Sequence, residues 1–124
     1  MVPVEEIAKT ILPRLTAGRY SSLSLNETLE VEKLRHGNND VDPIDLSTGA
    51  QGQLALVLRL AIIEYLGGKE RQMVIIDDAL VNFDQDRLRE GKRLLSEFAQ
   101  KDQVIYLSCH PELRDWDGAS VHEL

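Results

Sequence analysis

Two neighbouring carboxylates end an apolar stretch of the sequence. Asp77 and Asp78 follow the run from Met73 to Ile76, which is typical of a strand covered on both faces. Adjacent carboxylates at a poorly solvated strand end repel each other, and a divalent cation relieves that repulsion. Mg²⁺ prefers one or two carboxylates together with waters and phosphate oxygens, so one Asp can hold the metal while the other orients a water. The alternative is a solvated strand end that leads into a turn, the usual outcome for a bare Asp-Asp pair.

A histidine follows a second apolar run. His110 stands just after the stretch from Val104 to Leu107, where its imidazole can hydrogen-bond to a phosphate oxygen, although a lone histidine at a strand end is more often incidental. If the two runs are strands of one βαβ unit, their carboxyl ends lie at the same edge of a sheet, where ligands bind. We therefore expect a site formed by Asp77, Asp78 and the segment from Ser108 to His110.

Hydroxyl residues precede a long apolar segment. Ser47, Thr48 and Gly49 stand just before a helix expected from Gly52 to Leu66, and the positive end of a helix favours a phosphate. A structural explanation is also available, because Thr48 followed three residues later by Gln51 matches a capping box. Taken alone, the capping explanation is the better one.

The elements that must position these residues alternate between helix and strand. Residues 3–16 have apolar residues at helical spacing, and Tyr20 to Leu34 is expected to form a hairpin. Residues 36–43 have the composition of a surface loop. Asp84 is most simply the N-cap of a helix from Gln85 to Gln100, which joins the two apolar strands in a right-handed βαβ unit. The expected class is α/β.

Size, charge and cysteine content exclude several classes of protein. The 124 residues suffice for one domain, and 14 Lys and Arg against 21 Asp and Glu give a net charge of −7, so this chain alone is not expected to bind nucleic acid. Cys109 is the single cysteine, which excludes an internal disulfide framework and a Cys cluster for zinc and favours a cytoplasmic location. The longest nearly apolar run, Leu54 to Leu66, is too short to span a bilayer, so no membrane contact is expected.

In their order, these motifs resemble the C-terminal lobe of an ABC-type P-loop ATPase head. The group most similar is that of SMC, RecF and SbcC, and within it the YhaN-like coiled-coil AAA ATPases. The segments that carry the resemblance are a signature motif at Leu46-Ser47-Thr48-Gly49, a Walker B strand from Val74 to Asp78, a D-loop at Asn82-Phe83-Asp84 and an H-loop from Leu107 to His110. The resemblance covers about residues 14–113.

Three departures from the family pattern bear on activity. Thr48 and Ala50 stand where the signature motif often has Gly and a Gln or Glu, and Asp78 occupies the place of the usual catalytic Glu. RecF-like members share the Asp-Asp pair, so activity is compatible with Asp78, although its shorter arm changes the water geometry. The sequence contains no G-x-x-x-x-G-K-[ST] loop, so nothing in it can cradle the β- and γ-phosphates of ATP.

The resemblance implies a role for each site residue in the complete protein. Asp77 helps hold Mg²⁺, Asp78 positions or deprotonates the attacking water, and His110 contacts the γ-phosphate of ATP. Ser47, Thr48 and Gly49 reach the ATP held by a second head, and Asp84 lies along the seam between the heads.

The same resemblance implies that the chain is half of a split head. Residues 1–18 correspond to a coiled-coil root helix, 19–45 to a hairpin and loop, and 46–124 to the lobe with the signature motif, Walker B, D-loop and H-loop. The implied partners are the N-terminal Walker A lobe of the same protein, a second head in an ATP-sandwiched homodimer, and DNA for the full-length protein in DNA repair or chromosome maintenance. A mixed sheet is expected, and this piece alone is expected to be inactive.

Two further interpretations remain open on the sequence. One is a non-catalytic, ATP-gated clamp or scaffold head, in which Asp78 is too short to activate water and the cycle depends on binding alone. The other is an unrelated α/β interaction domain in which the order of motifs arose by chance.

Overall fold

The computed structural model describes residues 2–123 and has the expected α/β class. Its helices are α1 (Val2–Leu15), α2 (Thr48–Gly67) and α3 (Gln85–Lys101), and its strands are β1 (Ser22–Leu25), β2 (Val31–His36), β3 (Asn39–Val41), β4 (Met73–Asp77) and β5 (Gln103–Leu107). Two short 3-10 helices, η1 (Pro43–Asp45) and η2 (Pro111–Arg114), complete it. Across residues 2–123, no helix has the length and apolar character to cross a membrane.

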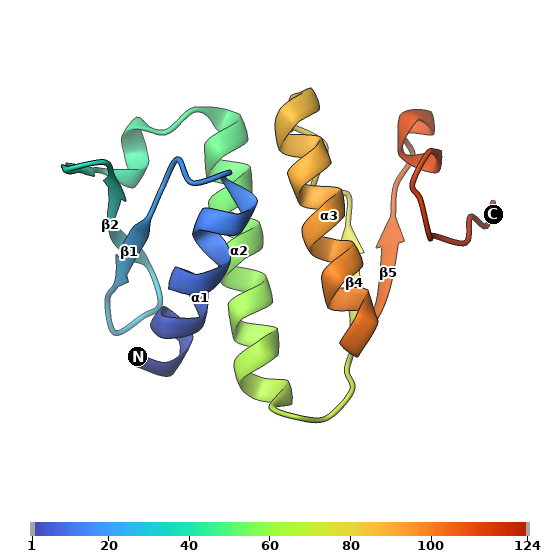
Figure 1. The fold of residues 1–124 in the computed structure, drawn as a ribbon, viewed down its shortest axis with the longest axis horizontal. Helices are drawn as coiled ribbons and strands as arrows, with labels where there is room; N and C mark the ends of the chain where they lie inside the picture. Colours follow the sequence, from blue (N-terminus) through green and yellow to red (C-terminus); the bar gives the residue numbers. More distant parts are fainter. Residues whose placement is uncertain (1, 124) are drawn as a thin grey trace.

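The strands form two separate sheets at opposite sides of the helices (Figure 1). Strands β1, β2 and β3 form an antiparallel sheet beside α1, and β4 and β5 form a parallel pair beside α3. The expected mixed sheet is thus divided into an antiparallel and a parallel part. The βαβ unit of β4, α3 and β5 is confirmed, and its register pairs Asp77 with Leu107, so the two strands end side by side.

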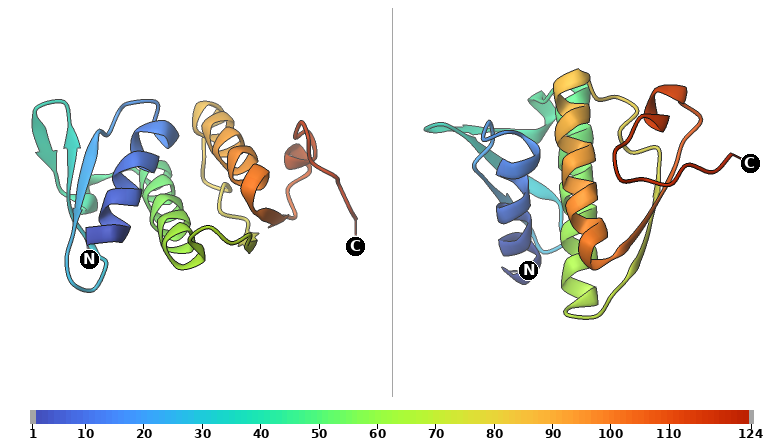
Figure 2. Two further views of the ribbon diagram at one scale, coloured as in Figure 1. Left: turned by 60° about the horizontal axis from the view of Figure 1, so that its bottom comes forward. Right: turned by 45° about the vertical axis from the view of Figure 1, so that its right-hand side comes forward.

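Helix α1 packs along α2, and the two run side by side in both views of Figure 2. Its buried face consists of Val4, Ala8, Ile11, Leu12 and Leu15, each at most 3% exposed. The helix continues for two residues beyond Pro13, a residue type that often kinks or ends a helix. The missing amide of Pro13 affects only the last turn, where Thr16 and Gly18 donate to the carbonyls of Leu12 and Pro13.

The predicted hairpin is confirmed, but the predicted loop after it is wrong. Asn26 forms the hairpin turn, because its side-chain oxygen accepts from the amides of Thr28 (2.9 Å) and Glu30 (3.0 Å). Residues 39–41 of the predicted loop form strand β3 instead. Gly37 has a φ of +63°, which places it in the left-handed region and lets the chain reverse within two residues, so β3 pairs with β2.

One face of the parallel pair is covered by α3, and the other, which the sequence predicts to be covered as well, is open within residues 2–123. Val74 and Ile76 are 2% and 0% exposed, whereas Met73 and Ile75 on the opposite face are 63% and 57% exposed. Alternation along the strand explains this, since successive side chains point to opposite faces. Among residues 2–123 nothing covers the face that carries Met73 and Ile75.

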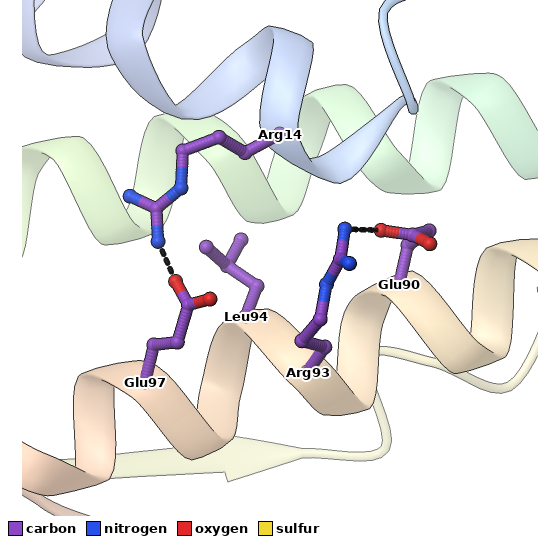
Figure 3. Close-up of a pocket in the computed structure, with 5 residues that line it drawn as sticks. All are labelled: Arg14, Glu90, Arg93, Leu94 and Glu97. Carbon is purple, nitrogen blue, oxygen red and sulfur yellow. Dashed lines mark hydrogen bonds and ion pairs between the residues drawn. The ribbon is translucent and has the colours of Figure 1, made fainter.

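Charged residues join α1 to α3 across a shallow pocket (Figure 3). Arg14 on α1 pairs with Glu97 on α3, and Arg93 pairs with Glu90 along α3 itself. The lining includes none of the residues that the sequence marks as candidate site residues. We therefore assign the pair of Arg14 with Glu97 to the packing of α1 on α3.

Candidate functional site

Strand β4 delivers the two carboxylates into different surroundings. Asp77 ends the strand and is exposed, on the same face as Ile75 by strand alternation. Asp78 follows with a φ of +54°, a left-handed conformation that is uncommon for a residue with a side chain, and its amide donates to the carbonyl of Leu107 (2.9 Å). This turn separates the two carboxylates.

Asp78 meets two residues that follow strand β5. The Ser108 hydroxyl donates to Asp78 Oδ1 at 2.8 Å, and His110 Nε2 lies 3.2 Å from Asp78 Oδ2. The backbone amide of His110 donates to Ser108 Oγ at 3.0 Å, which fixes the loop that carries the imidazole. The predicted meeting of the two strand ends is therefore present at Asp78, Ser108 and His110.

Asp77 stands apart from this contact. Its carboxylate has no hydrogen bond or ion pair within residues 2–123, and it is not among the neighbours of His110. A free, exposed carboxylate at the end of a strand retains its lone pairs for a hard cation such as Mg²⁺. The structure thus distinguishes two residues that are equivalent by adjacency in the sequence.

Tyr106 supports the turn after Asp78, a role that the sequence analysis missed. The amide of Leu80 donates to Tyr106 Oη at 2.8 Å. Burial, together with the nearby carboxylate of Asp78, raises the pKa of Tyr106 to about 12, so its hydroxyl stays protonated at neutral pH. The only signal in the sequence was an aromatic hydroxyl within an otherwise aliphatic strand.

At the start of α2, Ser47 is the N-cap. Its Oγ accepts from the amide of Ala50 at 3.2 Å. The predicted capping box, with Thr48 as the cap, is wrong by one residue, and the Gln51 side chain donates to the carbonyl of Leu46 (3.3 Å). Thr48 is exposed in the first turn, and Gly49 is buried. Because the first amides of a helix have no intrahelical acceptor, the amide of the exposed Thr48 stays available to an anion.

Arg87 joins the starts of α2 and α3. The predicted cap is confirmed, since Asp84 Oδ1 accepts from the Arg87 amide at 2.9 Å, while Asp84 Oδ2 lies 2.7 Å from the guanidinium. The bond from that amide, followed by the charge of Arg87, holds the pKa of Asp84 below its ordinary value. A Cβ at Gly49 would lie 3.0 Å from Arg87 Nη1, tighter than an ordinary contact, so glycine leaves room for the Arg87 side chain at the start of α2.

A buried glutamine extends this connection to α1. Arg87 Nε donates to Gln53 Oε1 at 3.1 Å, and Gln53 Nε2 donates to the carbonyl of Leu15, the last residue of α1, at 3.0 Å. Gln53 is only 3% exposed. Neither Arg87 nor Gln53 has a role that is evident from the sequence, where the available signal was an amide side chain early in a largely apolar helix.

The polar groups lie at one end of the molecule. In Figure 1, helices α2 and α3 begin, and strands β4 and β5 end, toward the same side. In the part of the chain that the structure describes, no hydrogen bond joins Asp78 or His110 to Ser47, Asp84 or Arg87. The site residues therefore form two groups: a strand-end cluster (Asp78, Ser108, His110) and a helix-start cluster (Ser47, Asp84, Arg87, Gln53).

Comparison with known proteins finds relatives by sequence, although no family model matches the chain. The uncharacterized protein YhaN of Bacillus subtilis is 29% identical over 112 residues, 89% of this chain and 12% of YhaN. The DNA double-strand break repair Rad50 ATPase of Methanocaldococcus jannaschii is 35% identical over 97 residues, 77% of this chain and 10% of that protein. Its counterpart from Archaeoglobus fulgidus is 30% identical over 122 residues, which are 93% of this chain and 14% of that protein. The chain thus spans 10% to 14% of these relatives' lengths.

Solved structures share the fold. One, described as "Structural biochemistry of ATP-driven dimerization and DNA stimulated activation of SMC ATPases", matches with a TM-score of 0.73 at 16% identity, covering 90% of this chain and 70% of that chain. The SMC head domain from Thermotoga maritima matches with a TM-score of 0.69 at 23% identity, covering 86% and 37%. The architecture of residues 2–123 is accordingly that of part of an SMC head domain.

Proposed function

We propose that this chain, which has the sequence and fold of the C-terminal lobe of an SMC/Rad50-like ATPase head, supplies the water-activating and γ-phosphate-contacting residues of an ATP site completed by other parts of the protein. The observation that carries this proposal is the contact of Asp78 with Ser108 and His110 at the adjoining ends of β4 and β5. Ligands of an α/β sheet bind at the carboxyl ends of its parallel strands, which is where this carboxylate and this imidazole lie.

Asp78 is the residue we assign to the attacking water. The Ser108 hydroxyl donates to Oδ1, and Oδ2, which lies 3.2 Å from His110 Nε2, keeps a second lone pair to accept the proton of a water. His110 Nε2 lies beside that oxygen and is exposed enough, at 35% of its side chain, to reach a phosphate oxygen. In this arrangement Ser108 positions the carboxylate, and the loop bond from the His110 amide positions the imidazole.

Asp77 is the residue we assign to Mg²⁺, because its carboxylate is exposed and has no protein partner within residues 2–123. When bound with ATP, Mg²⁺ would neutralise part of the charge of the phosphates. Ser47 and Thr48 are the candidates to bind a phosphate of the ATP that a second head holds. Capping uses a lone pair of Ser47 Oγ, so the hydroxyl proton remains free to donate.

The open face of the β4–β5 pair is the surface on which we expect a partner lobe to pack. Met73, Ile75 and Leu107 are 63%, 57% and 45% exposed, and large apolar residues of this kind on one sheet face mark a surface that another element covers. We assign this face to the N-terminal Walker A lobe of the same protein, since the sequence has no phosphate loop of its own. In domain terms, residues 1–18 serve as the coiled-coil root, 19–45 as the hairpin region and 46–124 as the nucleotide-facing part.

The complete protein is proposed to act on DNA in repair or chromosome maintenance and to engage a second head with ATP between them. The names of the Rad50 relatives and the ATP-driven dimerization of the SMC ATPases support these two parts of the proposal. A non-catalytic, ATP-gated clamp is the second candidate. It is favoured by the same contact, because both oxygens of the short Asp78 side chain already face protein groups.

Substitution of each carboxylate by its amide in the complete protein tests the assignment. Asp78→Asn is expected to leave Mg-ATP binding nearly unchanged, to lower turnover by about 100-fold or more and to trap engaged heads, because a general base matters mainly in the transition state. The matched control Asp77→Asn is expected to weaken Mg²⁺-dependent binding together with turnover. If Asp78→Asn is silent while Asp77→Asn loses binding, the clamp is the better account.

A further inference from the structure

We propose that Asp78, Cys109 and His110 form a binding site for a thiophilic divalent cation such as Zn²⁺, distinct in chemistry from the Mg²⁺ assigned to Asp77. One ligand atom of each residue (a carboxylate oxygen, the thiol sulfur and an imidazole nitrogen) lies within 4.8 Å of the other two. Asp78 and His110 are half-buried, and Cys109 is exposed. Counting cysteines does not reveal this ligand set, because only one of its three ligands is a thiol.

The spacing of the ligand atoms suits a tetrahedral ion. Two atoms bound to one Zn²⁺ at about 2.0–2.1 Å lie roughly 3.3 Å apart in that geometry. His110 Nε2 and Asp78 Oδ2 are 3.2 Å apart, so both can bind one ion without separating. Ser108 holds the other carboxylate oxygen and thereby directs Oδ2 toward the imidazole. The Cys109 side chain is exposed, and its sulfur lies within 4.8 Å of a ligand atom of each of the other two residues.

The donor set selects the kind of metal. Thiolate and imidazole bind Zn²⁺ and Co²⁺ strongly, whereas Mg²⁺ prefers oxygen ligands and retains its waters. Three protein ligands leave a fourth position, which is accessible because the side chains of Asp78 and His110 are 22% and 35% exposed. The site is therefore of the open, three-ligand type, and its occupancy responds to the supply of free metal.

A regulatory consequence rests on the proposed function. An ion bound here occupies Asp78 Oδ2 and His110 Nε2, the two atoms assigned to the water and the phosphate. Zn²⁺ binding and ATP hydrolysis are then mutually exclusive at this lobe. We infer that Zn²⁺ inhibits turnover of the complete protein and that Cys109, which has no part in hydrolysis, sets its sensitivity.

Titration of the chain with Co²⁺ tests the site without reference to hydrolysis. Because Cys109 is the single cysteine, a cobalt–thiolate charge-transfer absorption can come only from it. We expect this absorption in the wild type and its loss in Cys109→Ser. His110→Asn and Asp78→Asn are expected to raise the half-saturating Co²⁺ concentration by about 100-fold, since even a lost outer-shell partner costs about 10–100-fold.

The matched controls are His122→Asn and Asp77→Asn, which are expected to titrate like the wild type, with circular dichroism to confirm that every variant is folded. No thiolate absorption, or an absorption that persists unchanged in both His110→Asn and Asp78→Asn, overturns the site. In the complete protein, Zn²⁺ is expected to inhibit turnover in the wild type and at least 10-fold less effectively in Cys109→Ser. Metal binding without inhibition would retain the site and contradict the hydrolytic role proposed for Asp78.

Discussion

The strand-end cluster and the helix-start cluster lie toward the same end of the molecule and use their polar groups differently. Asp78, Ser108 and His110 bond mainly to one another, remain partly exposed and include a left-handed residue. The polar groups of the helix-start cluster satisfy helix ends and a buried amide, as the bond of Gln53 to Leu15 illustrates. Partly exposed residues that bond mainly to one another keep capacity for a ligand, whereas residues that serve helix ends hold the fold in place.

This difference gives the helix-start cluster a second role in linking elements. The path from Asp84 through Arg87 and Gln53 to Leu15 connects the start of α3, the start of α2 and the end of α1. No comparable path from the strand-end cluster reaches α1 within residues 2–123. A change at the helix starts is therefore expected to affect stability and geometry, and a change at the strand ends to affect chemistry.

Ser47 is the one residue of the helix-start cluster that we also assign to ATP. A substitution at Ser47 therefore tests the difference between the two clusters most strongly. In the complete protein, Ser47→Arg is expected to abolish ATP-dependent head engagement, because the long cation fills the place of the neighbouring phosphate. Loss of the cap should cost only about 1 kcal/mol of stability, so the fold survives. Sedimentation with and without ATP measures engagement, and Ser47→Ala controls for the cap. Equal engagement in Ser47→Arg and the wild type assigns Ser47 to capping alone.

The next largest effect is expected at Arg87. Arg87→Ala leaves Gln53 Oε1 buried without its donor, at a cost of about 1–3 kcal/mol in the free energy of unfolding. Arg89 is the matched control, since it forms an exposed pair with Asp86 at the same spacing, and Arg89→Ala is expected to cost less than about 0.5 kcal/mol. Urea unfolding of both variants measures the difference. Equal costs would refute the linking role of Arg87.

These contacts also mark how far sequence reasoning reaches. The βαβ unit and the meeting of Asp78 with His110 were predictable, because two apolar runs around a helix require parallel strands whose ends coincide. The partnership of Arg87 with Gln53 was not predictable, since it joins positions 34 residues apart and depends on how two helices pack. Strand β3 was missed because its polar residues read as a loop, although the turn at Gly37 pairs them with β2.

Adjacency likewise concealed the difference between the two Asp residues. Only the left-handed turn at Asp78 assigns one carboxylate to Ser108 and His110 and leaves the other free. The continuous apolar run of β4 indicated a strand with two covered faces, and in this chain one of them is exposed at Met73 and Ile75. That difference is what a sheet completed by another lobe would produce.

The smallest effect is expected from pH at Asp84. Its pKa lies below the ordinary value of 3.8, so its charge stabilises the fold fully above that value, and the contribution is lost as pH falls through the lower pKa of the folded state. Asn is also a good N-cap, so Asp84→Asn removes the charge and keeps the cap. At pH 6 the wild type is expected to have a higher free energy of unfolding than Asp84→Asn. Below about pH 4 this difference is expected to shrink. A difference that does not change with pH contradicts the ionic role.

We propose that this chain holds half of an ATP site and depends on another lobe for the phosphate loop. Calorimetric titration of the chain with Mg-ATP, alongside the complete protein, tests it most directly. The chain lacks the lysine and the run of backbone amides that bind the β- and γ-phosphates, and its net charge of −7 opposes the nucleotide. We expect no saturable binding by the chain and clear binding by the complete protein. Micromolar binding of Mg-ATP to residues 1–124 alone would contradict it.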